Sequence, residues 1–172
     1  MTSRQVLQTA RSARSAPREL LQSVFASELL SPSRCVWIVS PWLRDVPVLD
    51  NTGGAFASLA PEFPRTLVRL SHVLRELIAR GSAVVIATRS DPGNRQLMDA
   101  LGSVGAQSAL TFRERDELHA KGLVGDAYSL VGSMNLTYNG VERLDEMIVF
   151  ETAAPKVQEL RLMFYSEYGG TL

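Results

Sequence analysis

The sequence predicts a single α/β domain in which a β-sheet is covered by helices on its faces. Helical spacing of apolar residues alternates with short β-branched runs, in the order helix, strand, helix, strand, helix, strand. The length of 172 residues supports this prediction, because it allows one sizeable core and leaves little room for a second. We therefore treat residues 1–172 as one domain.

The first 30 residues are predicted to be a helical segment. Residues 1–18 carry four arginines, several serines and no acidic residue, a composition shared by organelle transit peptides and basic amphipathic helices. We favour the helix. From residue 17 to residue 30 the apolar residues recur at helical spacing, and Pro32 lies where the pattern ends.

The next segment predicts a buried strand, a long loop, a helix and a second strand. Residues 35–39 form an apolar run that is too short for a helix. Residues 44–65 are rich in Pro and Gly, and a loop of this length is usually a lid or a binding loop. Residues 66–80 place leucines on one face and end at Gly81, which predicts an amphipathic helix, and a strand over 83–88 follows.

The last part of the chain changes from this alternation to a hairpin. Two short apolar runs are separated by Gly125-Asp126, a tight-turn signal. The predicted elements are a helix over 91–101, a strand over 109–112, hairpin strands over 118–124 and 128–131, a strand over 146–151 and a helix over 155–168.

Composition excludes several classes of protein. The formal net charge is zero, so there is no global basic field and any phosphate binding must be local. No apolar stretch reaches the roughly 18 residues of a membrane span, and we expect a soluble, cytoplasmic protein. Cys35 is the only cysteine, which excludes an internal disulfide and a cysteine-based metal site. Its apolar neighbours favour a buried core thiol.

The residues that carry chemistry lie in the predicted hairpin. Residues two apart in a strand project to the same face, so His119 and Lys121 are expected to lie side by side. The hairpin then returns Ser133 and Asn135 to the same surface. Together these side chains provide a nucleophile, a cation and two uncharged hydrogen-bonding groups.

Phosphoryl transfer needs such a set. A group must attack phosphorus, and fixed positive charge and donors must surround the non-bridging oxygens, which Lys121, Ser133 and Asn135 can do. A histidine attacks only when neutral, and an acceptor on its other ring nitrogen fixes the tautomer. Glu146 is our candidate for that acceptor of His119.

The spacing His-x-Lys-x4-Asp from His119 to Asp126, followed by Gly-Ser-x-Asn from Gly132 to Asn135, resembles the signature of the phospholipase D superfamily, and the resemblance extends to Glu146. His-x-Lys or Gly-Ser-x-Asn alone would mean little. One departure is that five residues separate Asp126 from Gly132, where six are commonest. A tighter hairpin turn would absorb the difference.

The resemblance implies a mixed sheet between helices and catalysis without a metal or another cofactor. Members pair two motifs about a two-fold axis, and one histidine attacks phosphorus while the other protonates the leaving oxygen. This chain has one motif, since its other histidine, His72, is followed two positions on by Leu74 rather than Lys. A homodimer is therefore implied, in which His119 plays both parts, one in each subunit. We take His72 as a surface residue, and Asp126 as structural because turn geometry alone explains it.

The signature does not name the alcohols of the phosphodiester. Small single-motif members are mostly nucleases, which favours DNA or RNA as the partner of this chain. Trp42 and Arg44 follow a predicted strand end and could contact bases and phosphate, although core or lid packing explains Trp42 equally well.

Two alternatives stay open. One is a phospholipid-directed phosphodiesterase or transferase, which only the basic N-terminal segment supports. The other is a catalytically idle nucleic-acid-binding subunit of a larger assembly. In addition, residues 40–51 are similar to phospholipase-D-like proteins of bacterial gene clusters that place deazaguanine bases in DNA. That similarity implies a role in DNA modification or restriction, with other proteins of the cluster as partners.

Overall fold

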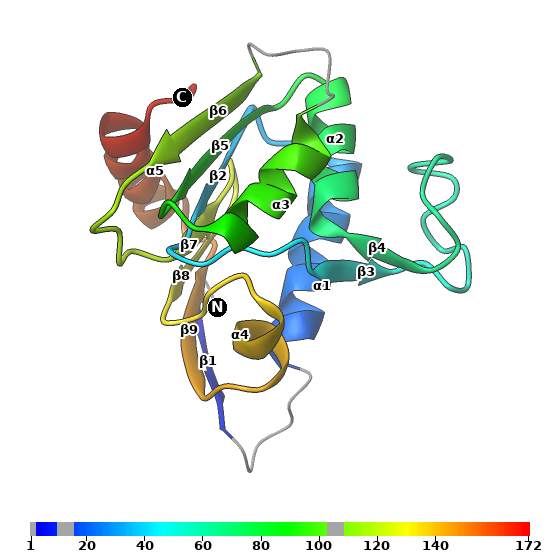
Figure 1. Cartoon of the computed structure of the whole chain (residues 1–172), viewed down its shortest axis with the longest axis horizontal. Coiled ribbons are helices and arrows are strands. Elements are labelled where there is room, and N and C mark those ends of the chain that lie inside the picture. Colours follow the sequence, from blue (N-terminus) through cyan, green and yellow to red (C-terminus); the bar gives the residue numbers. More distant parts are fainter. Residues whose placement is uncertain (1–2, 10–15, 103–108) are drawn as a thin grey trace.

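The structure is a computed structural model that describes residues 3–9, 16–102 and 109–172. Within these ranges a mixed seven-stranded sheet lies between helices, as Figure 1 shows. Its strands are β1 (Ser3–Gln8), β2 (Cys35–Val39), β5 (Ala83–Thr88), β6 (Leu110–Glu114), β7 (Gly122–Val124), β8 (Ser129–Gly132) and β9 (Glu146–Glu151).

The strand order β1-β9-β8-β7-β2-β5-β6 joins two kinds of pairing. β2, β5 and β6 are parallel, whereas β7, β8, β9 and β1 continue the sheet by antiparallel pairs. The helices are α1 (Ala16–Leu30), α2 (Leu70–Ala79), α3 (Pro92–Leu101), α4 (Tyr138–Glu142) and α5 (Ala154–Tyr168).

Two apolar cores form because β2 is buried on both faces. Val36 and Ile38 contribute to the core that lies against α1 and α2. The alternate residues Cys35, Trp37 and Val39 pack with β5, β7 and α5 on the other face. The expectation of helices on both faces is therefore confirmed. Burial raises the pKa of the Cys35 thiol to about 11, as expected for a thiol in the core.

The prediction of a helix at the N-terminus is wrong for Ser3–Gln8. These residues form β1, which pairs with β9 and is the outermost strand on that side of the sheet. Val6 and Gln8 are buried while Gln5 and Leu7 are exposed, so the strand period of two governs this stretch. The predicted helix is confirmed from Ala16 onward. Residues 1–2 and 10–15 of that prediction lie outside the described residues.

The predicted loop over 44–65 contains a short strand, β3 (Pro47–Asp50), which pairs with β4 (Leu67–Arg69) in a separate two-stranded sheet. The helix predicted to begin at residue 66 therefore begins at Leu70. His72 is half-buried, and its Nδ1 accepts a hydrogen bond from the Arg69 backbone N–H at 3.3 Å. It caps α2 rather than simply facing solvent.

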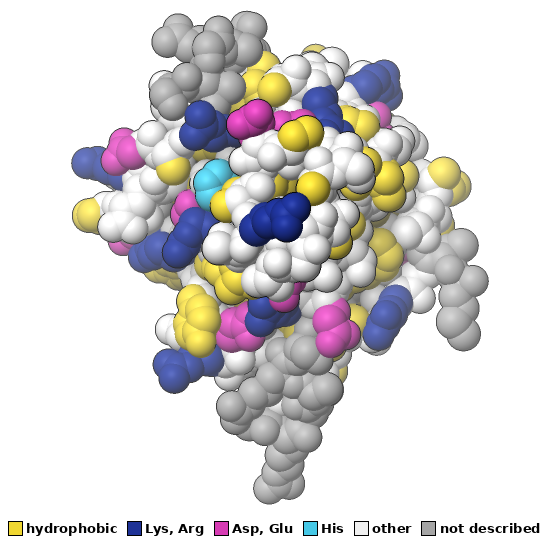
Figure 2. Space-filling view, turned by 90° about the vertical axis from the view of Figure 1, so that its right-hand side faces the viewer, with side chains coloured by type: hydrophobic (Ala, Val, Ile, Leu, Met, Phe, Trp, Pro, Cys, Tyr) yellow, Lys and Arg dark blue, Asp and Glu magenta, His cyan; other side chains and the backbone are white. Residues whose placement is uncertain are grey.

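The face shown in Figure 2 carries basic and acidic side chains interspersed, without one large patch of either sign. This distribution agrees with the zero net charge of the sequence. No helix in the described part of the chain is long and apolar enough to cross a membrane.

Candidate active site

Strand ends from both halves of the sheet meet at one edge. β2 and β5 are parallel, and Val39 pairs with Ala87 near their carboxyl ends. Val39 also pairs with Gly122, where the antiparallel strand β7 begins. Polar residues that follow or precede these strands therefore lie at the same edge, where open α/β sheets commonly place their ligands (Figure 1).

His119 and Lys121 precede β7 and are not part of a strand, because only Gly122–Val124 of the predicted strand 118–124 pair with neighbours. The strand alternation used to place the two side chains therefore does not apply. They are nevertheless in contact, since the Lys121 ammonium donates to the His119 carbonyl oxygen at 2.8 Å.

Arg89 is a site residue that sequence reasoning missed. Its Nη2 lies 2.9 Å from Nε2 of His119, and its Nε donates to the Leu118 carbonyl oxygen at 2.8 Å. A guanidinium only donates, so Nε2 of His119 is the acceptor in this hydrogen bond. The available signal was position, because Arg89 is the first residue after β5.

Trp42, a candidate substrate contact, lies beside Arg89. The Arg89 guanidinium carbon lies 5.4 Å from the centroid of its ring, and the side chain is 40% exposed. Ser40 links it to the motif, because the Ser40 hydroxyl lies 2.9 Å from the Trp42 carbonyl oxygen and 3.1 Å from Oδ1 of Asn135.

Arg44, the other predicted substrate contact, is not brought to His119. Its guanidinium donates to Oδ1 of Asn94 at 2.8 Å and forms an ion pair with Asp91 at 3.2 Å. Asp91 is the N-cap of α3. The described contacts of Arg44 therefore hold the chain after β2 against α3.

Ser133 follows β8 and is bound from two sides. Its hydroxyl donates to Oε2 of Glu146 and accepts the Met147 backbone N–H at 2.9 Å. Gly132 permits this approach, because a Cβ on it would lie 2.0 Å from the Met147 carbonyl oxygen. Glu146 is 5% exposed, so its carboxylate is buried beside the site.

The expected pairing of Glu146 with His119 is not seen within one chain. Among the described residues the Glu146 carboxylate bonds to Ser133, and the His119 ring bonds to Arg89. Glu146 thus positions Ser133 in this chain.

Asp126 lies at the opposite end of β7, in the hairpin turn. Its carboxylate binds the buried guanidinium of Arg161 and accepts the Arg34 backbone N–H at 3.0 Å. Burial raises the pKa of Asp126, but these bonds outweigh that effect, so its pKa lies below the ordinary 3.8. These contacts agree with a structural role.

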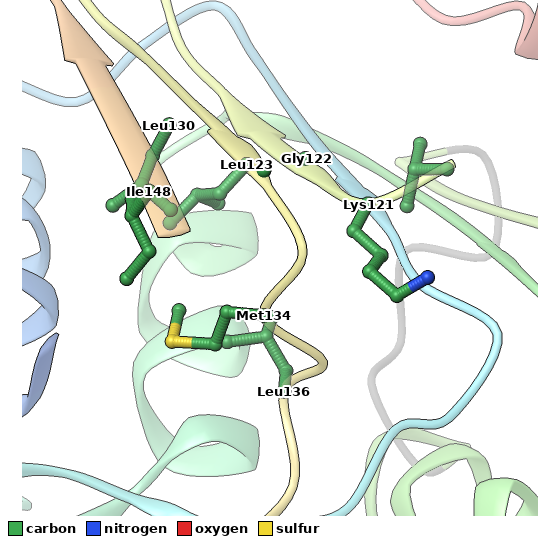
Figure 3. A pocket seen from close by; sticks show the side chains of 9 residues that line it. Lys121, Gly122, Leu123, Leu130, Met134, Leu136 and Ile148 are labelled. Atoms are coloured by element: carbon green, nitrogen blue, oxygen red, sulfur yellow. The ribbon is translucent and has the colours of Figure 1, made fainter. Parts of the chain in front are cut away.

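A small pocket beside the motif is apolar on one side, as Figure 3 shows. Leu130, Ile148 and Met134 gather there, while the Lys121 ammonium points away from them. The stem of Lys121 thus contributes to the pocket and its charge faces the other way. The lining residues are Val39, Lys121, Gly122, Leu123, Leu130, Gly132, Met134, Leu136 and Ile148.

No group of three or more His, Cys, Asp or Glu side chains that could hold a metal ion occurs among residues 3–9, 16–102 and 109–172.

Comparison with known proteins gives a family and a fold. The family model described as "Cardiolipin synthase, PLD-like domain" matches residues 55–167. No curated protein sequence matches significantly.

Two solved structures match over nearly the whole length of both chains. Nuc, a phospholipase D family member from Salmonella typhimurium, is 15% identical with a TM-score of 0.61, and the match covers 99% of this chain and 96% of Nuc. NucT from Helicobacter pylori is 12% identical with a TM-score of 0.58, and the match covers 95% of this chain and 94% of NucT.

A third match is partial. Phosphatidylserine synthase from Haemophilus influenzae is 11% identical with a TM-score of 0.56, over 95% of this chain and 36% of that one. At such low identities the structures establish the fold, and the family model covers well over half of the chain. The chain belongs to the phospholipase D-like family, whose members are typically phosphodiesterases.

Proposed function

We propose that this protein is a metal-independent phosphodiesterase that cleaves DNA or RNA, with His119 as the nucleophile. The observation that carries the proposal is that two series of contacts connect His119 to the other residues of the motif. One series runs through Arg89, Trp42 and Ser40 to Asn135, and the other through Lys121, Gly132 and Ser133 to Glu146.

The reaction follows from the state of the histidine. In one subunit Nε2 of His119 accepts the Arg89 hydrogen bond, and its lone pair can attack phosphorus once that bond is released. His119 of the partner subunit starts the reaction protonated, because two imidazoles that face one phosphate can hold different protonation states. A bond forms between Nε2 and phosphorus, and the bond from phosphorus to one ester oxygen breaks. That oxygen takes a proton from His119 of the partner subunit. Water then attacks phosphorus and displaces His119, and gives a proton back to His119 of the partner subunit.

Charge that develops on the non-bridging oxygens needs fixed donors. The Lys121 ammonium uses one N–H on the His119 carbonyl, which leaves two for a phosphate. The Asn135 amide is oriented because the Ser40 hydroxyl lies 3.1 Å from its Oδ1, and we assign its nitrogen as a donor to the phosphate. Donors held in this way stabilise a transition state without reorganising.

Two copies of the chain are required, because one motif supplies one histidine. The sheet offers a contact surface next to that motif: Leu7 and Met147 are paired across β1 and β9 and are 65% and 57% exposed. Met147 also holds Ser133 through its backbone. The apolar core between α5 and the strands β2, β5 and β7 does not include these two side chains. We assign the exposed surface of Leu7 and Met147 to contact with a second copy, since the shared site requires a second copy close to the motif.

We favour DNA as the substrate, in a cytoplasmic bacterial modification or restriction system with other proteins as partners. The similarity of residues 40–51 to proteins of deazaguanine gene clusters supports this setting. Trp42, within that segment, lies at the site.

The test is cleavage of single- and double-stranded DNA and RNA in excess EDTA, with His119→Ala and His72→Ala in parallel. We expect metal-independent cleavage that His119→Ala abolishes and His72→Ala preserves. Cleavage of phospholipid vesicles instead, or undiminished cleavage by His119→Ala, would contradict the proposal. Binding of DNA without cleavage would indicate the catalytically idle subunit.

A further inference from the structure

The Arg89 guanidinium has no carboxylate partner in the described part of the chain. No Asp or Glu oxygen lies within 4.0 Å of its guanidinium among the described residues, whereas Arg44 pairs with Asp91. A cation that is not neutralised at a sheet edge attracts an anion. The Arg89 guanidinium is also positioned, since its Nε bond to the Leu118 carbonyl fixes the plane of the group.

The hydrogen bond from Arg89 to His119 occupies the lone pair that would attack. A nitrogen that accepts a hydrogen bond at 2.9 Å cannot at the same time attack phosphorus. A phosphate oxygen is a stronger acceptor than a neutral imidazole, because it is charged. An arriving phosphodiester therefore draws the Arg89 N–H away from the ring and frees the nucleophile.

Trp42 supplies an aromatic surface on the other side of Arg89. Trp42 is 40% exposed although it lies beside fixed polar groups, whereas Trp37 is fully buried. Exposed aromatic rings next to arginines stack on bases that are not paired in a duplex. A base can reach such a ring only in a single strand or after leaving the duplex.

We propose that Arg89 is a further catalytic residue and that Arg89 and Trp42 form a subsite for one unpaired nucleotide of a nucleic acid strand. In the subunit whose His119 attacks, Arg89 donates a hydrogen bond to Nε2 before substrate binds, and then redirects that hydrogen bond to a non-bridging oxygen of the phosphate under attack. Trp42 stacks on the adjoining base. This inference rests on the proposed function and narrows its substrate to single-stranded segments.

Arg115 provides a matched control. It follows β6 at the same edge of the sheet and lies over the Tyr168 ring at 5.2 Å, but it pairs with Glu167 at 3.3 Å. We expect Arg89→Ala to lower kcat about 100-fold, as loss of one transition-state donor does, and Arg115→Ala to change it less than about 3-fold. Arg89→Gln, which keeps a neutral donor, should fall between.

A readout independent of catalysis is the rate at which diethyl pyrocarbonate modifies His119, measured by peptide mapping against His72. Removal of the Arg89 hydrogen bond exposes the Nε2 lone pair, so Arg89→Ala should accelerate modification of His119 and leave that of His72 unchanged. Equal rates for His119 in the wild type and Arg89→Ala would overturn the assignment even if the wild type cleaved no nucleic acid.

The Trp42 half of the subsite is tested by intrinsic fluorescence in His119→Asn, where no cleavage occurs. A single-stranded oligonucleotide should quench the fluorescence of exposed Trp42. Adding Trp42→Ala to His119→Asn should weaken binding of that oligonucleotide about 10-fold. A blunt duplex should bind equally to the variants with and without Trp42. Equal loss on both substrates would overturn the single-strand assignment. Cleavage by the wild type with unchanged kcat in Arg89→Ala would leave the proposed function standing and refute the role of Arg89.

Discussion

The carboxylate of Asp126 binds the guanidinium of Arg161, a side chain of α5 that is completely buried. The Arg161 guanidinium carbon also lies 5.6 Å from the centroid of the Trp37 ring. The aspartate of the motif thus fastens the β7–β8 hairpin to the last helix, at the end of β7 away from His119. Its contribution is expected in stability rather than in chemistry.

Asp126→Asn should lower the free energy of unfolding by about 3 kcal/mol, because it leaves a buried guanidinium without its counter-charge. Urea unfolding of the variant measures this change, with the exposed Asp99→Asn as the control. A variant that retained full stability but lost all cleavage would show that Asp126 acts in catalysis instead.

The same carboxylate should give a pH-dependent contribution to stability. Its pKa is lowered in the folded state, so its stabilisation is fully present above the unfolded value of 3.8 and is lost as pH falls through the lower folded value. The stability difference between the wild type and Asp126→Asn should therefore be constant above about pH 5 and shrink toward about pH 2. A difference that grew on acidification would contradict this sign.

Gly132→Ala should disrupt the site through the backbone. The added Cβ would lie 2.0 Å from the Met147 carbonyl oxygen, so β8 and β9 must separate and Ser133 must move from Glu146. We expect a loss of about 1–3 kcal/mol in stability and at least a 10-fold loss of kcat. Gly53→Ala is the control, since nothing lies within 4 Å of its Cβ.

Met147→Glu should prevent dimer formation, because it places a charge on the exposed apolar pair with Leu7. Light scattering should give the mass of a monomer for this variant and of a dimer for the wild type. Leu30→Glu, at a residue that is 70% exposed at the end of α1, should remain dimeric. A wild-type protein that was monomeric at micromolar concentration would refute the shared site.

Local patterns were sufficient for the elements whose partners are near in sequence or whose burial is complete. The strand over 35–39 and the strand over 83–88 were predicted with the bounds that the structure has, because apolar runs of that length fit the centre of a sheet. β1 was missed because its partner β9 lies at the other end of the chain. The basic composition of residues 1–18 favoured a helix, and only the pairing with β9 fixes β1 as a strand.

The motif residues could be identified from spacing, but their contacts could not. The loop before β7 is irregular, so no period places His119 and Lys121. Arg89 meets His119 only because the end of β5 and the beginning of the antiparallel strand β7 both lie beside the end of β2, although the two residues are 30 positions apart in sequence. The sequence likewise could not indicate that Arg44 would turn to Asp91 while Trp42 turned to the site.

The most direct test of the central claim uses dimers that carry one wild-type subunit and one His119→Ala subunit, isolated with two different affinity tags. Each such dimer has one His119 imidazole, which can attack phosphorus. It has no second His119 imidazole to protonate the leaving oxygen. We predict that its rate of cleavage falls at least about 100-fold below that of the wild-type dimer. Half of the wild-type rate would show that each subunit cleaves alone, and would contradict a site shared by two copies of His119.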